Sequence, residues 1–433
     1  MNKRWSYLFN IATYSFLCGS LYYWYSAFSP VLRSDIANVQ ISDFAYYLAF
    51  VREFWFGGLT SIYSLDAYLQ VLPQFLVKGS EPLPMPLAVT PVVLFLWAPF
   101  SCLSFLSFEL AQAAWVAVSL QLFFSQLFWI GAEVLQRKVQ ERVFFYLLLL
   151  PVVFSFTFVS TIVLGQTSIF AAGALMYFAR RYLAAENTER DRIEARSVLL
   201  LVCLAIKPHY FALALGLVLL SGRWRVLCLG VALSVLTVLL LSLRLEALWY
   251  TDYLGNMRIF ASGAIPKIYL HAFAPESMNL FVPAFSPLLG TRPCILLANT
   301  VLFLIFGMVF AYAFFWTWAS KRSSSPFGFY RALSGVLLLL GAYLLFAPYA
   351  GTYEDLLLSS AVFMLLVQGG GARQSIRGGV ILSFLLSVLL NHNLFPDSLP
   401  LFLFWLLKLL FFCYLLSEIF QRSVYLRETG RAQ

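Results

Sequence analysis

Apolar residues dominate the chain in long runs that short polar connectors separate. Runs such as "VLFLIFGMVFAYAFFWTW" from Val301 and "LFLFWLLKLLFFCYLL" from Leu401 approach or reach the ~20 residues that cross a hydrocarbon core as a helix. Backbone groups in lipid must bond within their own segment, so isolated strands are excluded for these runs. The pattern predicts an all-α integral membrane protein, a polytopic bundle of about twelve transmembrane helices with a range of about ten to thirteen. The expected helices are 6–28, 87–106, 109–134, 143–163, 167–183, 197–220, 226–248, 293–318, 329–350, 355–369, 378–392 and 399–417.

Two long segments differ from ordinary connectors because they mix aromatic and charged residues. They are residues 29–86, which contain "FWFGGLTSIYSLDAYLQVLPQFL", and residues 249–292, which begin "WYTDYLGNMRIF". Apolar residues in the first recur every three or four positions, as in a helix that lies flat on a membrane. Their aromatic content argues against disorder. We predict one transmembrane domain, residues 1–433, with interfacial helices in both segments.

Composition supports the membrane class and excludes others. The chain is 61% hydrophobic and only 11% charged, with a mean hydropathy of +0.82, whereas a soluble domain carries roughly 25% charged residues. The net charge of +9 comes from basic residues scattered between apolar runs, which is typical of membrane orientation and not of nucleic-acid binding. The 6 cysteines lie mostly inside apolar runs, a distribution that favours neither disulfides nor a metal site.

The orientation follows from the basic residues nearest the first helix. Lys3 and Arg4 place the N-terminus in the cytoplasm, so that both long segments are expected to be extracytoplasmic. A basic start without a small-residue cleavage site favours a retained helix over a signal peptide.

The same helix count leaves a mismatch in the middle of the chain. It puts Arg137-Lys138 and the stretch "ARRYLAAENTERDRIEARS" outside, against the positive-inside rule. In an alternative topology, segment 197–220 is a re-entrant pair broken at Lys207-Pro208, since proline disrupts a helix interior.

Two carboxylates follow the first apolar segment. Asp43, in "SDFAYY", either caps a helix that starts at Phe44 or acts as a general base at the membrane boundary. Asp35 is either solvated, paired with a nearby arginine, or part of the same site.

Polar residues inside apolar runs form a second group of candidates. Gln166 lies in "GQTSIF", which is either a plain turn between two apolar runs or part of a site, and Lys207 and His209 lie in "AIKPHYF". An ionisable group at membrane depth is a functional candidate because it is costly to leave unpaired, although a lysine also snorkels from a helix end. Tyr353 and Glu354 in "APYAGTYEDLLL" are further candidates at an expected outer boundary. Arg258, Lys267 and His271 lie in the second long segment, where they would suit an anionic leaving group, although solvation in a loop explains them equally well.

The order "SDFAYYLAF", "IYSLDAYLQ", "PMPLAVTPVVLFLWAPF", "GQTSIF", "CLAIKPHYFALALGLVLLSGRWR" and "FAPYAGTYEDLLL" resembles glycosyltransferase family 87, over roughly residues 40 to 360. That family includes mycobacterial mannosyltransferases that use polyprenyl-phosphate-mannose. The resemblance implies the C-type glycosyltransferase fold, with an active site under the first long extracytoplasmic segment. It also implies an essential aspartate, which matches Asp43 with Tyr46 or Tyr47 beside it.

The sequence departs from the family pattern at two places. The family often shows Tyr-Pro-Pro after the first loop, where this chain has Met85-Pro86, and Asn-Gln-Ser in the second long loop, where it has "SMNLF" around Asn279. These differences concern the sugar and the acceptor more than the fold.

The sequence thus predicts a glycosyltransferase of a bacterial inner membrane, with an extracytoplasmic active site and no cofactor. A hexose, mannose-like, or a pentose would pass from a polyprenyl-phosphate donor to a hydroxyl on a lipid or glycan acceptor, with inversion. Asp43 would be the general base. The donor phosphate would meet Lys207, Arg258, Lys267 and His271, while Asp35, Tyr47, Gln166, His209, Tyr353 and Glu354 would bind sugar or acceptor. The sequence contains no Asp-x-Asp pair, the motif that would suggest a metal site.

Two other classes of function remain open at this point. In a transporter or flippase for a lipid-linked or anionic solute, Lys207 and Gln166 would line a pathway at bilayer depth. In a structural or assembly subunit without turnover, Asp43 would serve only as a helix cap.

Overall fold

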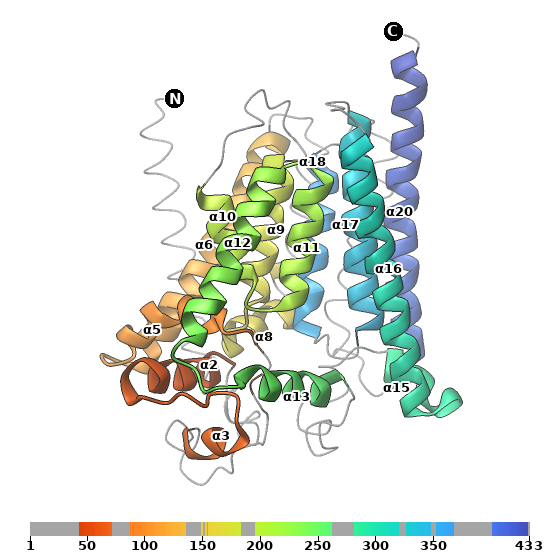
Figure 1. Cartoon of the computed structure of the whole chain (residues 1–433). Helices are drawn as coiled ribbons and strands as arrows, with labels where there is room; N and C mark the ends of the chain where they lie inside the picture. Colours follow the sequence, from red (N-terminus) through yellow and green to blue (C-terminus); the bar gives the residue numbers. More distant parts are fainter. Residues whose placement is uncertain are drawn as a thin grey trace, which may run out of the picture.

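The computed structural model of the chain is a bundle of α-helices (Figure 1). It describes residues 43–71, 87, 89–135, 149, 152–153, 155–182, 195–261, 281–319, 326–347, 352–367 and 401–431, and these ranges contain helices and no strand. The all-α prediction is confirmed for them. The predicted helices 6–28 and 378–392 lie outside the described residues.

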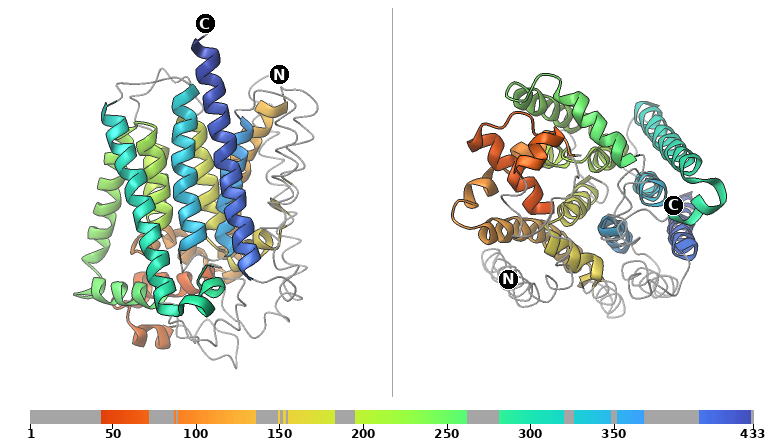
Figure 2. Two further views of the ribbon diagram at one scale, coloured as in Figure 1. Left: turned by 90° about the vertical axis from the view of Figure 1, so that its right-hand side faces the viewer. Right: turned by 90° about the horizontal axis from the view of Figure 1, so that it is seen from below.

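The long helices run along a common axis (Figures 1 and 2). They are α6 (Phe108–Leu135), α9 (Ser168–Tyr182), α12 (Trp224–Ser242), α16 (Thr291–Ala319), α17 (Pro326–Phe346), α18 (Leu356–Val367) and α20 (Leu401–Arg431). Among the residues that the structure describes, three helical segments are long and apolar enough to cross a membrane: Leu110–Ile130, Trp224–Ser242 and Arg292–Phe315. The apolar runs 109–134, 167–183 and 293–318 are therefore confirmed as helices, whereas the total of twelve spanning helices stays a prediction.

Segment 197–220 forms two helices instead of one. Helix α10 (Ala195–Leu204) and helix α11 (Pro208–Leu220) measure about 15 Å and 20 Å at 1.5 Å per residue, short of the ~30 Å core. Proline disfavours helical backbone in the preceding residue, and Lys207 is accordingly extended, with φ −118° and ψ 121°. Pro208 then opens α11, a position where its missing N–H costs nothing.

The two helices form a hairpin whose open end faces the far end of α9. At that end the Arg196 guanidinium lies 5.1 Å from the ring centroid of Tyr177, and the Arg223 guanidinium lies 5.2 Å from that of Tyr182. The corner at Lys207 lies near the opposite end, beside the first turn of α9, as the 3.0 Å contact between Tyr210 and Ser168 shows. The break predicted as the alternative topology is thus present.

The prediction of one helix over 87–106 is wrong. The segment contains two short helices, α4 (Val92–Leu96) and α5 (Ala98–Leu103), and α5 lies across the bundle end (Figure 1). Pro99 cannot donate to the carbonyl four residues earlier, and its ring clashes there. The indole of Trp55 takes up another carbonyl at the break, donating to Leu94 over 2.9 Å.

The end of the bundle drawn lowest in Figure 1, called the lower end from here on, gathers the short helices. These are α2 (Asp43–Arg52), the π-helical turn η1 (Glu53–Gly57), α3 (Leu65–Val71), α8 (Phe156–Leu164), α13 (Trp249–Ala261) and α15 (Phe281–Leu289). Helix α13 lies roughly at right angles to the long helices (Figure 1). Parts of both long aromatic segments therefore occupy the same end.

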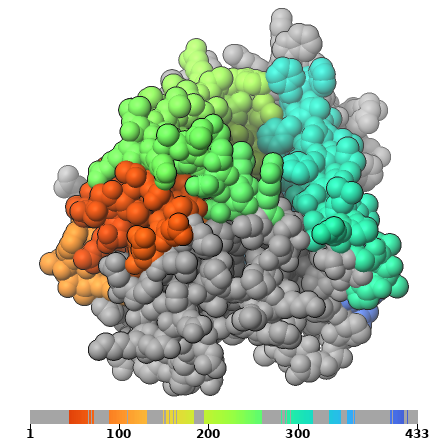
Figure 3. Space-filling view, turned by 60° about the horizontal axis from the view of Figure 1, so that its bottom comes forward, coloured from red at the N-terminus to blue at the C-terminus, as the bar shows by residue number. Residues whose placement is uncertain are grey.

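Those two segments pack directly on one another, and their surfaces adjoin in Figure 3. The ring of Tyr63 stacks on Trp249 with centroids 5.6 Å apart and meets Tyr253 edge-on at 5.5 Å. The buried Asn256 amide of α13 donates to the carbonyls of Tyr63 and Leu87 over 3.0 and 3.1 Å. These bonds hold α13 against the segment that follows α2.

Basic residues gather at the opposite end, called the upper end. Arg180 and Arg181 end α9, Arg196 lies in the first turn of α10, and Arg223 and Arg225 flank the start of α12. At the lower end, by contrast, Arg52 and Arg244 are mixed with acidic residues such as Glu53, Glu246 and Asp252. The end of α9 and the starts of α10 and α12 thus lie together at the upper end, as the contacts of Arg196 with Tyr177 and of Arg223 with Tyr182 show.

Candidate functional site at the lower end of the bundle

A buried ionic cluster lies where the hairpin corner meets the turn between α17 and α18. Glu354 belongs to the 3₁₀ turn η4 (Thr352–Asp355). Its Oε1 lies 3.3 Å from Lys207 Nζ and 3.2 Å from His209 Nε2. Both partners come from the Lys-Pro-His corner between α10 and α11. The interruption of the helix at Pro208 therefore places two basic side chains beside one carboxylate.

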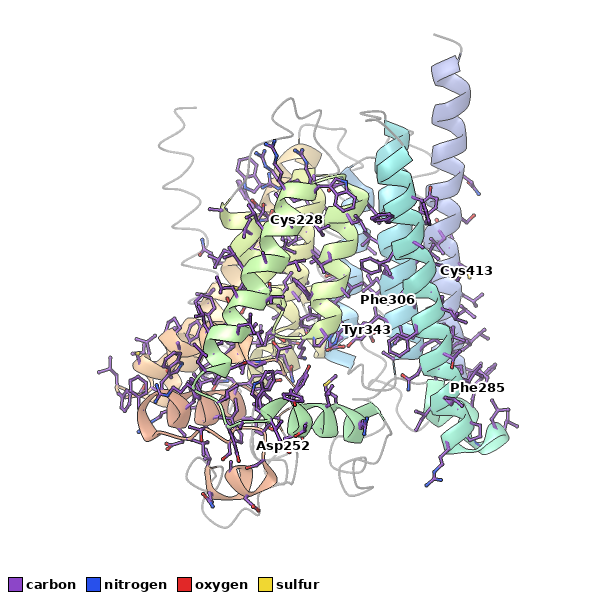
Figure 4. All side chains as sticks on the ribbon, viewed as in Figure 1. Cys228, Asp252, Phe285, Phe306, Tyr343 and Cys413 are labelled. Carbon is purple, nitrogen blue, oxygen red and sulfur yellow. The ribbon has the colours of Figure 1, made fainter. Side chains whose placement is uncertain are left out.

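Two tyrosines complete the shell around this carboxylate. The Tyr210 hydroxyl donates to Oε1 over 3.2 Å, and the Tyr343 hydroxyl of α17 donates to Oε2. The His209 and Tyr343 rings stack with centroids 4.4 Å apart and an interplanar angle of 15°. Tyr343 lies inside the bundle above α13, whose Asp252 is also labelled in Figure 4. We refer to Lys207, His209, Tyr210, Tyr343 and Glu354 as the Glu354 cluster.

The electrostatics of the cluster explain why a carboxylate persists in so apolar a place. The Glu354 side chain is 2% exposed and that of Lys207 is 9% exposed. Burial alone raises the pKa of Glu354, but the facing His209 and Lys207 outweigh burial and hold the pKa below its ordinary value of 4.5. The carboxylate is therefore ionised at neutral pH. Its four donors leave its oxygens well satisfied, as a buried charge requires.

Helix α2 and the Gly-Gln turn meet beside this cluster. Gly165 ends α8 with φ +62°, and a Cβ built on it would lie 2.4 Å from Phe44 Cβ. Ser168, three residues later, contacts the Tyr210 hydroxyl at 3.0 Å. Asp43 directly precedes Phe44 and is the first residue of α2. The backbone at Phe44, the residue after Asp43, thus lies against the turn that leads into the Glu354 cluster.

Aromatic rings fill the space around the start of α2. Tyr47 is 6% exposed and meets Trp97 with ring centroids 5.4 Å apart. The ring centroids of Trp97 and Trp115 are 4.3 Å apart. The Trp115 indole donates a hydrogen bond to the carbonyl of Gly165 over 2.9 Å. This packing fixes α2 and the Gly165 turn relative to each other.

The structure brings together some predicted site residues and not others. Lys207, His209 and Glu354 meet in one cluster, and Gln166 is buried in the adjoining turn, as Tyr47 is in α2. Arg258 is exposed on α13. Tyr353 lies in η4 next to Glu354. Asp35, Lys267 and His271 lie outside the described residues.

Sequence reasoning missed the two tyrosines and a second ion pair. Tyr210 directly follows His209, so its position was a usable signal, whereas Tyr343 lies in the apolar run "GAYLLF" and carries none. Lys408 of α20 lies 2.8 Å from Oδ2 and 2.9 Å from Oδ1 of Asp355. Within the described residues, no three His, Cys, Asp or Glu side chains are placed to hold a metal ion.

Comparisons of the chain with protein-family models, with characterised proteins and with solved structures find no match.

Proposed function

We propose that the protein is a membrane glycosyltransferase that takes a sugar from a polyprenyl-phosphate carrier, with a C-type glycosyltransferase fold. The observation that carries the proposal is the meeting of four distant motifs at one bundle end. The start of α2 with Asp43, the Gly165–Ser168 turn, the Lys207–Tyr210 corner and Glu354 are joined by the contacts Phe44–Gly165, Ser168–Tyr210 and Tyr210–Glu354. These motifs appear in the order that resembles glycosyltransferase family 87.

In the proposed reaction Asp43 accepts the proton of the acceptor hydroxyl. The acceptor oxygen bonds to the anomeric carbon as the bond from that carbon to the phosphate oxygen breaks, and the electron pair leaves with the phosphate. Lys207, with Arg258, Lys267 and His271, offsets the charge of the departing lipid phosphate. Asp35, Tyr47, Gln166, His209, Tyr353 and Glu354 bind the sugar or the acceptor.

The charge distribution supports an extracytoplasmic lower end. Arg180, Arg181, Arg196, Arg223 and Arg225 lie at the upper end, and arginine-rich ends of membrane helices favour the cytoplasm. A flipped polyprenyl donor presents its sugar on the opposite face, where α2 and α13 lie. A bacterial inner membrane fits this arrangement.

A transporter or flippase is the second candidate. It is favoured by the broken helix pair α10–α11, which places a buried lysine at its corner, because discontinuous helices with ionisable residues are typical of transport sites. In that case the ion pair of Lys207 with Glu354 would open for an anionic solute.

A reconstitution experiment separates the two candidates. Purified protein in liposomes is given radiolabelled polyprenyl-phosphate mannose, glucose or arabinose together with a lipid extract that contains acceptors. In parallel, dithionite bleaching of a fluorescent polyprenyl-phosphate analogue reports lipid flipping. Labelled product without accelerated bleaching supports the glycosyltransferase. Accelerated bleaching without product in any donor series contradicts it and favours the flippase.

A further inference from the structure

A second buried ion pair adjoins the Glu354 cluster. Lys408 Nζ is 2.8 Å from Oδ2 and 2.9 Å from Oδ1 of Asp355, and the two side chains are 5% and 1% exposed. Asp355 is the residue after Glu354 and the last residue of η4. The two adjacent carboxylates of one short turn are therefore each held by a lysine from a different helix.

The position of Lys408 is unusual for a residue whose only task is packing. It interrupts the apolar run "WLLKLLFF" of α20, and a buried ion pair is often no more stabilising than apolar residues of the same volume. Helix α20 already has apolar and polar contacts to α17 nearby, since the Trp405 indole donates to the carbonyl of Leu345 over 3.0 Å. Packing alone does not call for a charge at this position.

The geometry of η4 gives the pair a different role. Glu354 and Asp355 are consecutive residues of a turn of 4 residues, so a shift of the backbone at one of them is carried to the other. Lys408 holds Asp355 from the α20 side, and Lys207, His209 and Tyr210 hold Glu354 from the α11 side. A shift of the backbone at Asp355 toward or away from α20 therefore shifts the backbone at Glu354 relative to α11.

We propose that Lys408 and Asp355 are positioning residues that set the placement of Glu354 against the Lys207–Tyr210 corner and so couple helix α20 to the site. The expected effect on turnover rests on the proposed glycosyltransferase function. The structural coupling of Lys408 to Glu354 does not depend on that function.

The first test is a double-mutant cycle on thermal unfolding in detergent, which needs no activity. The variants are Lys408→Met, Glu354→Gln and the double variant, with Cys413→Ser as the control. Cys413 lies on the same helix with an exposed thiol and points away from the bundle (Figure 4). If Lys408 positions Glu354, its loss removes part of the benefit of Glu354, so the two decreases in unfolding temperature are less than additive. Additive decreases would show that Lys408 and Glu354 act independently, and they would overturn the proposal.

The second test uses sugar transfer and the charge-reversed pair Lys408→Asp with Asp355→Lys. Each single change is expected to lower kcat at least tenfold, with a smaller change in KM for the donor, and the double change to recover most of the loss. Equal losses in the single and double variants at unchanged protein yield overturn the proposal. If Lys408→Met does not accumulate, Asp355→Asn replaces it in the double-mutant cycle. Absence of transfer by the wild type together with a less-than-additive cycle contradicts the glycosyltransferase and supports the positioning role.

Discussion

Phe44 and Gly165 lie so close together that Gly165 has no room for a side chain. A Cβ on Gly165 would be 2.4 Å from Phe44 Cβ, and the residue also has a φ of +62°. The contact joins the first turn of α2, where Asp43 lies, to the turn that leads through Ser168 to the Glu354 cluster. Through these contacts the residue next to the proposed base is connected to the buried ionic residues.

Replacing Gly165 with alanine is therefore expected to displace α2 as well as to strain the turn. Gly58→Ala is a matched control, because Gly58 has a φ of +77° and no heavy atom within 4 Å of its Cβ position. Both variants incur the left-handed backbone cost of roughly 1–2 kcal/mol, and Gly165→Ala adds an overpacking cost of about 1–3 kcal/mol. Thermal unfolding in detergent measures the difference. Equal losses in the two variants would show that the contact with Phe44 is unimportant.

Removal of the lysine from the Glu354 cluster is expected to be strongly destabilising. Lys207→Met leaves Glu354 buried without its ammonium partner, and breaking a buried pair typically costs about 3–5 kcal/mol. The double variant with Glu354→Gln removes the uncompensated charge while keeping an acceptor for the Tyr210 and Tyr343 hydroxyls, and it is expected to recover a large part of that loss. Arg292→Met, at an exposed arginine, serves as the control with an effect within about 0.5 kcal/mol. A Lys207→Met protein as stable as the wild type would contradict the pairing.

The stability that Glu354 contributes has a defined pH dependence. Because His209 and Lys207 hold its pKa below 4.5 despite burial, the contribution is fully present above pH 4.5 and is lost as the pH falls through the native pKa. The difference in unfolding temperature between the wild type and Glu354→Gln should stay constant from neutral pH down to about pH 4.5 and shrink only below that pH. A difference that already disappears between about pH 7 and 5.5 would mean that the pKa is raised.

The proposed orientation predicts which side each end of the bundle faces. In a cysteine-free background, single cysteines replace the exposed residues Asp252 at the lower end and Arg225 at the upper end. A membrane-impermeant maleimide should label position 252 in spheroplasts and position 225 only after the membrane is permeabilised. The reverse pattern would place the site on the cytoplasmic face, where a flipped polyprenyl donor does not reach it.

The long helices were predictable because apolar content over about 20 residues is a strong signal, as α6 and α16 show. The sequence also pointed to the break before Pro208, since proline has a direct effect on the backbone. The same effect at Pro99 was overlooked within 87–106, where the surrounding run is apolar enough to span. Hydropathy does not separate one long helix from two short helices such as α4 and α5.

The candidate site was only partly predictable for a different reason. Lys207, His209 and Glu354 were suggested individually as charged residues in or beside apolar runs, but no periodicity told which of them meet. Tyr343 resembles any core aromatic until Glu354 is seen beside its hydroxyl. Lys408 did carry a signal, a charge inside an apolar run, and its partner Asp355 became evident only from the fold.

The most direct test of the central claim is transfer of radiolabelled sugar from polyprenyl-phosphate donors, with wild type compared with Asp43→Asn. Asp66→Asn, at an exposed aspartate of α3, is the matched control. The account predicts transfer by the wild type and by Asp66→Asn, and a loss of about 10²–10⁴-fold in Asp43→Asn at equal expression, the usual size of a general-base contribution. Full activity of Asp43→Asn would contradict the assignment of Asp43 as the base. No transfer by the wild type from any donor, with acceptor-containing lipids present, would contradict the glycosyltransferase itself.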